Sequence, residues 1–258
     1  MLDILRQTAI EAGQAILAIY RRGASVEWKP DCSPVTDADC EAERIILAAL
    51  LKAFPDIPVV AEESVAAGCV PDISGGTFFL VDPLDGTREF IARHDDFTVN
   101  IALIEAGKPV LGVIYAPALG LLYTGAGGRA EKVVIGEDAV EQPSVVIGCR
   151  NRGDRIVAVA SRSHNSEETL AYLHEHGLQD FQAVGSSLKF CLLAEGLADI
   201  YPRFGRTMEW DTAAGDAILR AAGGETLTMD GAPLAYGKRD MGGKEDFANP
   251  FFVSRGRP

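Results

Sequence analysis

The sequence lacks the features that mark several other classes of protein. No apolar run approaches the length that spans a bilayer, and residues 1–6 include an acid where a signal peptide would carry basic residues. The five cysteines form no CxxC pair and leave an odd one out, which argues against a zinc site or a disulfide framework. We therefore expect a cytoplasmic protein without a transmembrane segment, and leave open peripheral association with the cytoplasmic face of the inner membrane.

Basic residues are scarce relative to acidic ones. The chain has 24 lysines and arginines against 37 aspartates and glutamates, which gives a net charge of −13. Because this balance supplies no basic footprint, we do not expect a nucleic acid as a partner, whereas a few local cations and bound Mg²⁺ could hold a free nucleotide. With 258 residues, of which 47% are hydrophobic, the chain is long enough for one large globular domain or two of ordinary size.

The stretch around which the chain is organised begins with the apolar residues 77–81, which predict a buried strand. It ends in the motif Asp82-Pro83-Leu84-Asp85-Gly86-Thr87. Because Pro83 fixes its backbone and removes a donor, we expect the strand to stop there and the two aspartates to turn toward one point, where hard oxygen ligands suit Mg²⁺. A helix that begins near Thr87 would direct free N–H groups at a phosphate, although Asp-Gly is also a common turn dipeptide.

Two other segments carry acids that could join this motif. The apolar residues 58–61 end in Glu62 and Glu63, and a strand here could lie beside the strand of residues 77–81, which would bring the ends of both strands together. Asp211 precedes a helix of small residues. Its carboxylate either caps that helix or reaches the same metal cluster from the second half of the chain.

The remaining pattern indicates two lobes. Residues 3–22 have helical periodicity, as does a segment that begins at Thr36 or Asp37. Residues 97–124 contain three strands of an antiparallel meander, with the glycines that follow as a tight connection. After an irregular stretch at residues 141–155, strands and helices alternate. We expect an α+β lobe over residues 1–150, which carries most of the candidate metal ligands, and an α/β lobe over residues 151–258, which carries Asp211.

Taken together, the acidic motifs resemble the lithium-sensitive, magnesium-dependent phosphatases of the inositol monophosphatase superfamily, in the family's order and over nearly the whole chain. Finer similarity comes from residues 161–164, 185–191, 194–196 and 201–205, which resemble the CysQ branch, the 3′(2′),5′-bisphosphate nucleotidases. The resemblance implies an α/β fold, a layered αβαβα sandwich of the inositol monophosphatase and fructose-1,6-bisphosphatase type. It also implies hydrolysis of adenosine 3′,5′-bisphosphate to AMP in sulfate assimilation, with up to three Mg²⁺ ions and Mn²⁺ as a substitute.

The same resemblance assigns roles to individual residues. The metal ligands would be Glu62, Asp82, the main-chain carbonyl of Leu84, Asp85 and Asp211. Thr87 would hydrogen-bond the attacking water, with Asp39 behind it as the base, while Asp37 remains an alternative because both aspartates lie in one short segment. The substrate residues, which form a nucleotide pocket largely in the second lobe, would be Gly86, Thr87, Ser161, His164, Gly185, Lys189, Arg203 and Asp211.

Three rival interpretations compete with this one. A phosphatase of the same superfamily that acts on inositol phosphate or another polyol phosphate would share the metals and differ in its pocket. A haloacid-dehalogenase-type phosphatase needs one residue between its two aspartates, whereas Pro83 and Leu84 both separate Asp82 from Asp85. A non-catalytic nucleotide- or metal-binding module would have lost some of the expected ligands, and all are present. The family resemblance allows a homodimer and leaves the choice between adenosine 3′,5′-bisphosphate and its sulfated form open.

Overall fold

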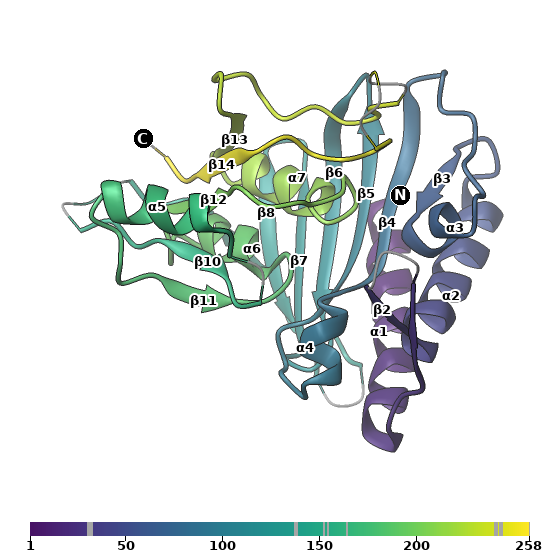
Figure 1. Ribbon diagram of the computed structural model, residues 1–258. Coiled ribbons are helices and arrows are strands. Elements are labelled where there is room, and N and C mark those ends of the chain that lie inside the picture. The colour runs from purple at the N-terminus through teal and green to yellow at the C-terminus, as the bar shows by residue number, and fades with distance from the viewer. Residues whose placement is uncertain are drawn as a thin grey trace.

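The computed structural model describes residues 1–29, 33–136, 139–151, 153, 155–163, 165–239, 242 and 245–257. Its largest element is a seven-stranded sheet with the order β3-β4-β5-β6-β7-β8-β9, seen at the centre of Figure 1. The strands are β3 (Val59–Ala61), β4 (Thr77–Asp85), β5 (Thr98–Glu105), β6 (Lys108–Ala116), β7 (Leu121–Ala126), β8 (Arg129–Val134) and β9 (Val145–Ile147). The predicted meander is confirmed as β5 to β7, with glycines at the turn that follows, and β8 and β9 extend it beyond the prediction.

Strand β4 differs from the prediction at Pro83. The strand runs through this residue as far as Asp85, but its pairing with β5 is regular only to Asp82 and resumes at Asp85. The expectation that the strand stops at Pro83 is therefore wrong. The ring of proline is compatible with extended backbone and removes only the N–H donor, so the ladder is interrupted while the strand continues.

Two long helices cover one face of this sheet. Helix α1 (Leu2–Arg22) and helix α2 (Asp37–Ala53) bury their apolar stripes against it, as the helical periodicity predicted. Thr36 is the N-cap of α2 and forms a capping box with Asp39, which decides between the two predicted caps. A hairpin of β1 (Val26–Trp28) and β2 (Pro34–Thr36) connects the two helices. This hairpin brings the chain to the edge of the site described below.

The opposite face of the sheet carries helix α7 (Ala213–Ala221), which packs on β5, β6 and β7. Helix α6 (Leu188–Ala194) lies against α7, and the two helices approach closely at Gly215. A Cβ atom on Gly215 would lie 2.4 Å from the ring of Phe190, so only glycine permits this contact. The prediction that α7 is a closely packed helix of small residues is confirmed.

Beyond α6 and α7 lie two smaller sheets and an outer helix. One sheet pairs β10 (Val159–Ser161) with β11 (Gln182–Val184) in parallel, and the other has the order β12-β14-β13. The remaining elements are β12 (Ile200–Arg203), β13 (Glu225–Thr228), β14 (Phe252–Arg255), α5 (Glu167–Glu175) and the short helices α3 (Glu62–Ala66) and α4 (Thr87–Ile91). The layers therefore follow in the order helices, large sheet, helices, small sheets and α5 (Figure 1). Within the described part of the chain, no helix is long and apolar enough to cross a membrane.

Candidate active site

The ends of β3 and β4 meet as the sequence predicted. The two strands are parallel neighbours, and Ala61 pairs with Val81, so the next residues along the chain, Glu62 and Asp82, emerge at the same edge of the sheet. This register explains why two acids that are distant in sequence come together. A continuous apolar run determines each strand, and the parallel pairing then places their acidic ends side by side.

Asp211 reaches this edge from the second half of the chain. It lies directly before α7, and because α7 packs on β5, β6 and β7, the start of that helix is held over the large sheet. The hydroxyl of Ser187 connects the two sides, since it is 2.7 Å from Oδ2 of Asp85 and 2.7 Å from the carbonyl oxygen of Asp211. Asn100 donates to the same oxygen of Asp85 over 3.2 Å. The sequence offered no signal for Ser187 or Asn100 as organisers of this site.

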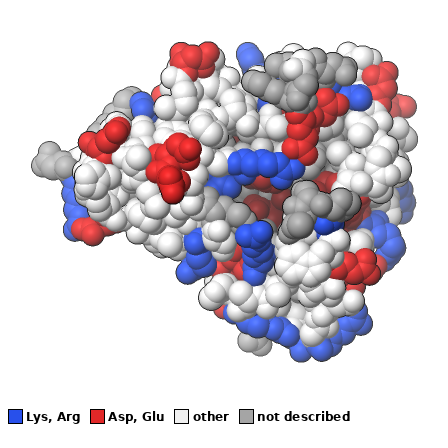
Figure 2. All heavy atoms as spheres, viewed as in Figure 1, with Lys and Arg blue, Asp and Glu red and all other residues white. Residues whose placement is uncertain are grey.

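Glu62, Asp82, Asp85 and Asp211 line a cleft of about 660 Å³, a volume in the range of small-molecule sites. Figure 2 shows a hollow with acidic atoms inside it and lysine and arginine side chains around it. The acidic lining consists of Glu62, Asp82, Asp85, Glu89, Asp211, Glu245 and Asp246. The basic lining consists of Lys29, Arg88, Lys189, Arg203 and Arg206. A cleft with both charges can hold cations on one wall and phosphate groups on the other.

Burial and crowding shift the acids of this cleft toward their neutral forms. Burial raises the pKa of Asp82 well above its ordinary value, and the charges of Glu62, Asp85 and Asp211 raise it further. Burial, followed by the charges of Asp85 and Glu62, raises the pKa of Asp211 to about 8. Clustered carboxylates that resist ionisation in this way are stabilised by a cation among them. An all-oxygen donor set of this kind suits Mg²⁺.

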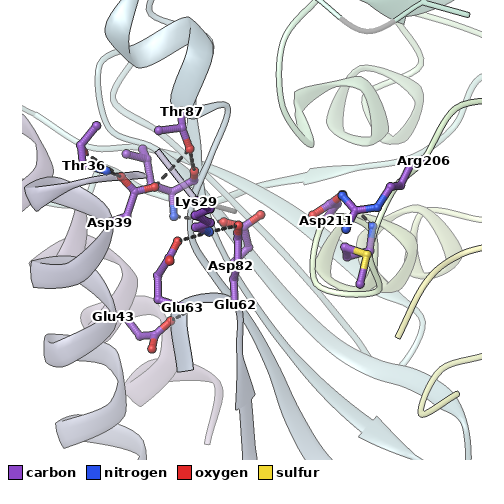
Figure 3. Close-up of polar contacts among 12 residues, drawn as sticks. Lys29, Thr36, Asp39, Glu43, Glu62, Glu63, Asp82, Thr87, Arg206 and Asp211 are labelled. Carbon is purple, nitrogen blue, oxygen red and sulfur yellow. Dashed lines mark hydrogen bonds and ion pairs between the residues drawn. The ribbon is translucent and has the colours of Figure 1, made fainter. Parts of the chain in front are cut away.

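A lysine that the sequence analysis did not single out occupies part of this acidic wall. The Nζ atom of Lys29 lies 2.8 Å from Oε1 of Glu62 and 2.8 Å from Oε1 of Glu63 (Figure 3). Although burial opposes the charge of the ammonium, these two carboxylates raise the pKa of Lys29. Among the described residues, no three His, Cys, Asp or Glu side chains are arranged to hold a metal ion. The charges of Glu62 and Asp85 nevertheless raise the pKa of both Asp82 and Asp211, so these acids lie close enough to act on one another.

Thr87 and Asp39 form the second part of the site. The hydroxyl of Thr87 donates to Oδ1 of Asp39 over 3.1 Å, while Oδ2 of Asp39 accepts from the amide and the hydroxyl of Thr36 at 2.8 and 2.7 Å. Burial raises the pKa of Asp39 to about 6, against the effect of these hydrogen bonds. Asp37 lies elsewhere, since it pairs with Arg22 at 2.9 Å. The geometry therefore favours Asp39 over Asp37 as the partner of Thr87.

The candidate substrate residues come from several elements around the cleft. Ser161 lies at the end of β10, Arg203 at the end of β12, and Gly86 directly before α4. The ammonium of Lys189 is buried and donates to the carbonyl oxygens of Val184 and Ser186. Burial lowers the pKa of Lys189 to about 8, against the charge of Asp85. His164 lies outside the described residues.

Gly185, another candidate substrate residue, has its backbone amide already bonded to a protein carboxylate. Its amide donates to Oδ2 of Asp96 over 2.6 Å, so the N–H group faces the first half of the chain.

Two other residues that the sequence analysis missed also shape the site. Glu43 accepts from the amide of Glu63 at 2.8 Å and thereby holds the turn that carries Glu62, while Arg206 pairs with Glu245 at 2.8 Å on the rim of the cleft. No local pattern marks these contacts, because each joins residues at least 20 positions apart.

Layered sheets and helices that surround an acidic cleft, with a paired hydroxyl and carboxylate beside it, define a phosphatase-type hydrolase. The chain belongs to the inositol monophosphatase family, because the sequence profile of that family matches residues 1–249. Phosphatases of this family depend on metal ions, typically Mg²⁺. The family and the fold that the motifs predicted are confirmed.

Several curated relatives carry the name 3′(2′),5′-bisphosphate nucleotidase CysQ. The 3′(2′),5′-bisphosphate nucleotidase CysQ of Salmonella typhimurium is 47% identical over 254 residues, which cover 98% of each chain. CysQ of Escherichia coli K12 is 45% identical over 254 residues, again 98% of each chain. Among solved structures, CysQ from Bacteroides thetaiotaomicron has a TM-score of 0.80 at 39% identity and covers 97% of this chain and 95% of its own. An inositol monophosphatase from Anabaena has a TM-score of 0.74 at 25% identity, covering 99% and 90%. The predicted similarity to the CysQ branch is confirmed.

Proposed function

We propose that this protein is a Mg²⁺-dependent phosphatase that removes the 3′-phosphate of adenosine 3′,5′-bisphosphate to give AMP and phosphate. The observation that carries the proposal is a cleft whose lining combines the acids Glu62, Asp82, Asp85 and Asp211 with the cations Lys189 and Arg203. A substrate with two phosphate groups needs both. The identity of 45–47% with relatives named CysQ supports this choice of substrate.

We propose that Glu62, Asp82, the carbonyl of Leu84, Asp85 and Asp211 hold up to three Mg²⁺ ions, for which Mn²⁺ can substitute. When bound, such ions neutralise the oxygens of the transferring phosphate and make water more acidic near neutral pH. Ser187 and Asn100 fix the orientation of the Asp85 carboxylate by donating to the same oxygen. The ammonium of Lys29 would leave Glu62 free when the ions bind.

Thr87 and Asp39 move the proton in this proposal. Because Thr87 donates its own hydrogen to Asp39, a lone pair of its oxygen is directed away from Asp39 and can accept a hydrogen bond from the attacking water. A pKa of about 6 lets Asp39 be ionised at neutral pH and still accept a proton during the reaction. The two hydrogen bonds from Thr36 keep the carboxylate in place. In-line attack on phosphorus then releases the 3′-oxygen of the ribose.

We further propose that the nucleotide lies between an α+β lobe of residues 1–150 and an α/β lobe of residues 151–258. Lys189 and Arg203 would pair with the 5′-phosphate, and Ser161 and His164 would contact the nucleoside. Gly86 would allow the scissile phosphate to come close to the backbone. The Gly185 amide is bonded to Asp96, so we expect Gly185 to contact the nucleotide through its carbonyl or Cα atom.

The test is phosphate release with Mg²⁺ from adenosine 3′,5′-bisphosphate and from inositol 1-phosphate in parallel, each repeated with Li⁺. We expect a large preference for the nucleotide and inhibition by Li⁺. Preference for inositol 1-phosphate would retain the acidic wall and overturn the substrate assignment. Absence of release from either substrate would favour a non-catalytic binding module.

A further inference from the structure

Two carboxylates of the first half of the chain are buried close to the cleft and play no part in the proposed metal site. Glu89 lies in α4 and is 3% exposed, and Asp96 lies between α4 and β5 and is 9% exposed. Burying a carboxylate is costly unless it is hydrogen-bonded, so the partners of these two residues indicate what they do. Both reach across to the second half of the chain.

Asp96 holds the segment that leads into α6. Its Oδ2 atom accepts from the amide of Gly185 over 2.6 Å and from Nε of Arg162 over 3.0 Å. The backbone is equally close, because a Cβ atom on Gly185 would lie 2.6 Å from the carbonyl oxygen of Asp96. Burial opposes the charge of Asp96, but the hydrogen bonds from Gly185 and Arg162 hold its pKa below the ordinary value. Asp96 therefore stays ionised and retains both bonds.

Glu89 holds the neighbouring segment. Its Oε1 atom accepts from the hydroxyl of Ser163 over 2.5 Å, and its Cγ atom would lie 2.8 Å from a Cβ atom on Gly185. Ser163 follows β10, whereas Gly185 follows β11, and these two strands are parallel partners with Ser161 opposite Val184. The two carboxylates therefore form hydrogen bonds with the residues that follow β10 and β11.

The segments that Glu89 and Asp96 contact, around Ser163 and Gly185, also carry the substrate residues proposed above. Ser161 and Arg162 come directly before Ser163. Lys189 lies four residues after Gly185, in the first turn of α6. Glu89 is itself close to the Asp82–Thr87 motif, since it lies two residues after Thr87 in the same short helix. The contacts therefore join the part of the chain that binds metal to the part that we propose binds nucleotide.

We propose that Asp96 and Glu89 are positioning residues that set the nucleotide-binding wall at the correct distance from the metal-binding wall. The inference rests on the proposed function and extends it, because it identifies residues that place the nucleotide-binding segments. Because Asp96 and Glu89 hold the nucleotide-binding segments in place before the substrate arrives, their loss should weaken ground-state binding of the nucleotide. The two hydrogen bonds of Asp96 involve none of the proposed metal ligands.

The decisive variant is Asp96→Ala, with Asp95→Asn as its matched control. Loss of hydrogen bonds to a charged group predicts a rise of about tenfold in KM for adenosine 3′,5′-bisphosphate. We expect kcat and the Mg²⁺ concentration for half-maximal activity to stay within about twofold of the unaltered enzyme, since only ground-state positioning is lost. Asp95 is exposed and bonds only weakly to Tyr20, at 3.4 Å, so Asp95→Asn should leave all three quantities unchanged.

Ser163→Ala provides a second test that removes only one hydroxyl, and it decides the matter if Asp96→Ala does not fold. We expect a smaller rise in KM, about threefold, with kcat unchanged. An unchanged KM in a folded variant, or a fall in kcat accompanied by a changed Mg²⁺ requirement, overturns the inference. If the unaltered enzyme releases no phosphate from adenosine 3′,5′-bisphosphate, the proposed function fails first, so the two failures can be told apart.

Discussion

Thr87 donates its hydroxyl hydrogen to Asp39 over 3.1 Å and thereby joins α4 to α2 across 48 residues of sequence. Asp39 can serve Thr87 only because the capping box at Thr36 turns its carboxylate toward the cleft. A residue that caps a helix thus also takes part in the candidate active site. The same contact separates Asp39 from Asp37, whose carboxylate faces Arg22.

The first prediction concerns this pair. Thr87→Ala should lower kcat by about 100-fold or more, because general-base assistance through the hydroxyl is lost. Thr87→Ser retains the hydroxyl and should keep most of the activity. Steady-state phosphate release measures both, and Asp37→Asn is a matched control that we expect to remain active. Equal activity of Thr87→Ala and Thr87→Ser would show that the hydroxyl has no role.

The second prediction concerns Asp85. Asp85→Asn should abolish turnover while the fold stays intact, because asparagine has the same shape and its oxygen can still accept from Ser187. Burial raises the pKa of Asp85, so removing its charge should not lower the thermal midpoint of the metal-free protein. Phosphate release and a thermal melt on one preparation test both parts. An active Asp85→Asn enzyme would contradict the proposed metal cluster.

The third prediction concerns metal removal. A chelator should abolish activity, and returning Mg²⁺ should restore it and raise the thermal midpoint, because a ligand that binds only the folded state stabilises it. At 100 times the dissociation constant this stabilisation is about 2.7 kcal/mol. The readout is a melt with and without Mg²⁺, and Asp85→Asn should show a much smaller shift. A shift of equal size in both proteins would place the ion elsewhere.

The fourth prediction concerns pH. Burial lowers the pKa of Lys189 to about 8. Below that pH the side chain is an ammonium that attracts phosphate, and above it the charge is lost, so KM for adenosine 3′,5′-bisphosphate should rise as the pH passes about 8. Lys189→Met should raise KM at neutral pH and remove this rise. A pH profile of KM that is the same in both proteins would exclude Lys189 as a ligand of the substrate.

Much of the fold and the acidic wall could be predicted from local pattern. The apolar runs that precede Glu62 and Asp82 indicated two strands, and the parallel pairing of β3 with β4 confirmed that their ends meet. The prediction was less accurate at Pro83, where an interrupted ladder was read as the end of a strand. It also missed β8 and β9, whose short and mostly polar or exposed sequences give little period-two signal.

The sequence by itself determined the candidate chemistry of this protein. Its acids follow apolar runs, its Asp-Pro-Leu-Asp-Gly-Thr motif follows a strand, and both patterns depend only on neighbours along the chain. The tertiary structure alone decided which groups surround that chemistry: Lys29 between two glutamates, Ser187 between two aspartates, and Asp96 against Gly185. These contacts depend on how whole elements pack, since side chains tens of residues apart meet only after the sheets and helices have assembled, and no local pattern records that geometry.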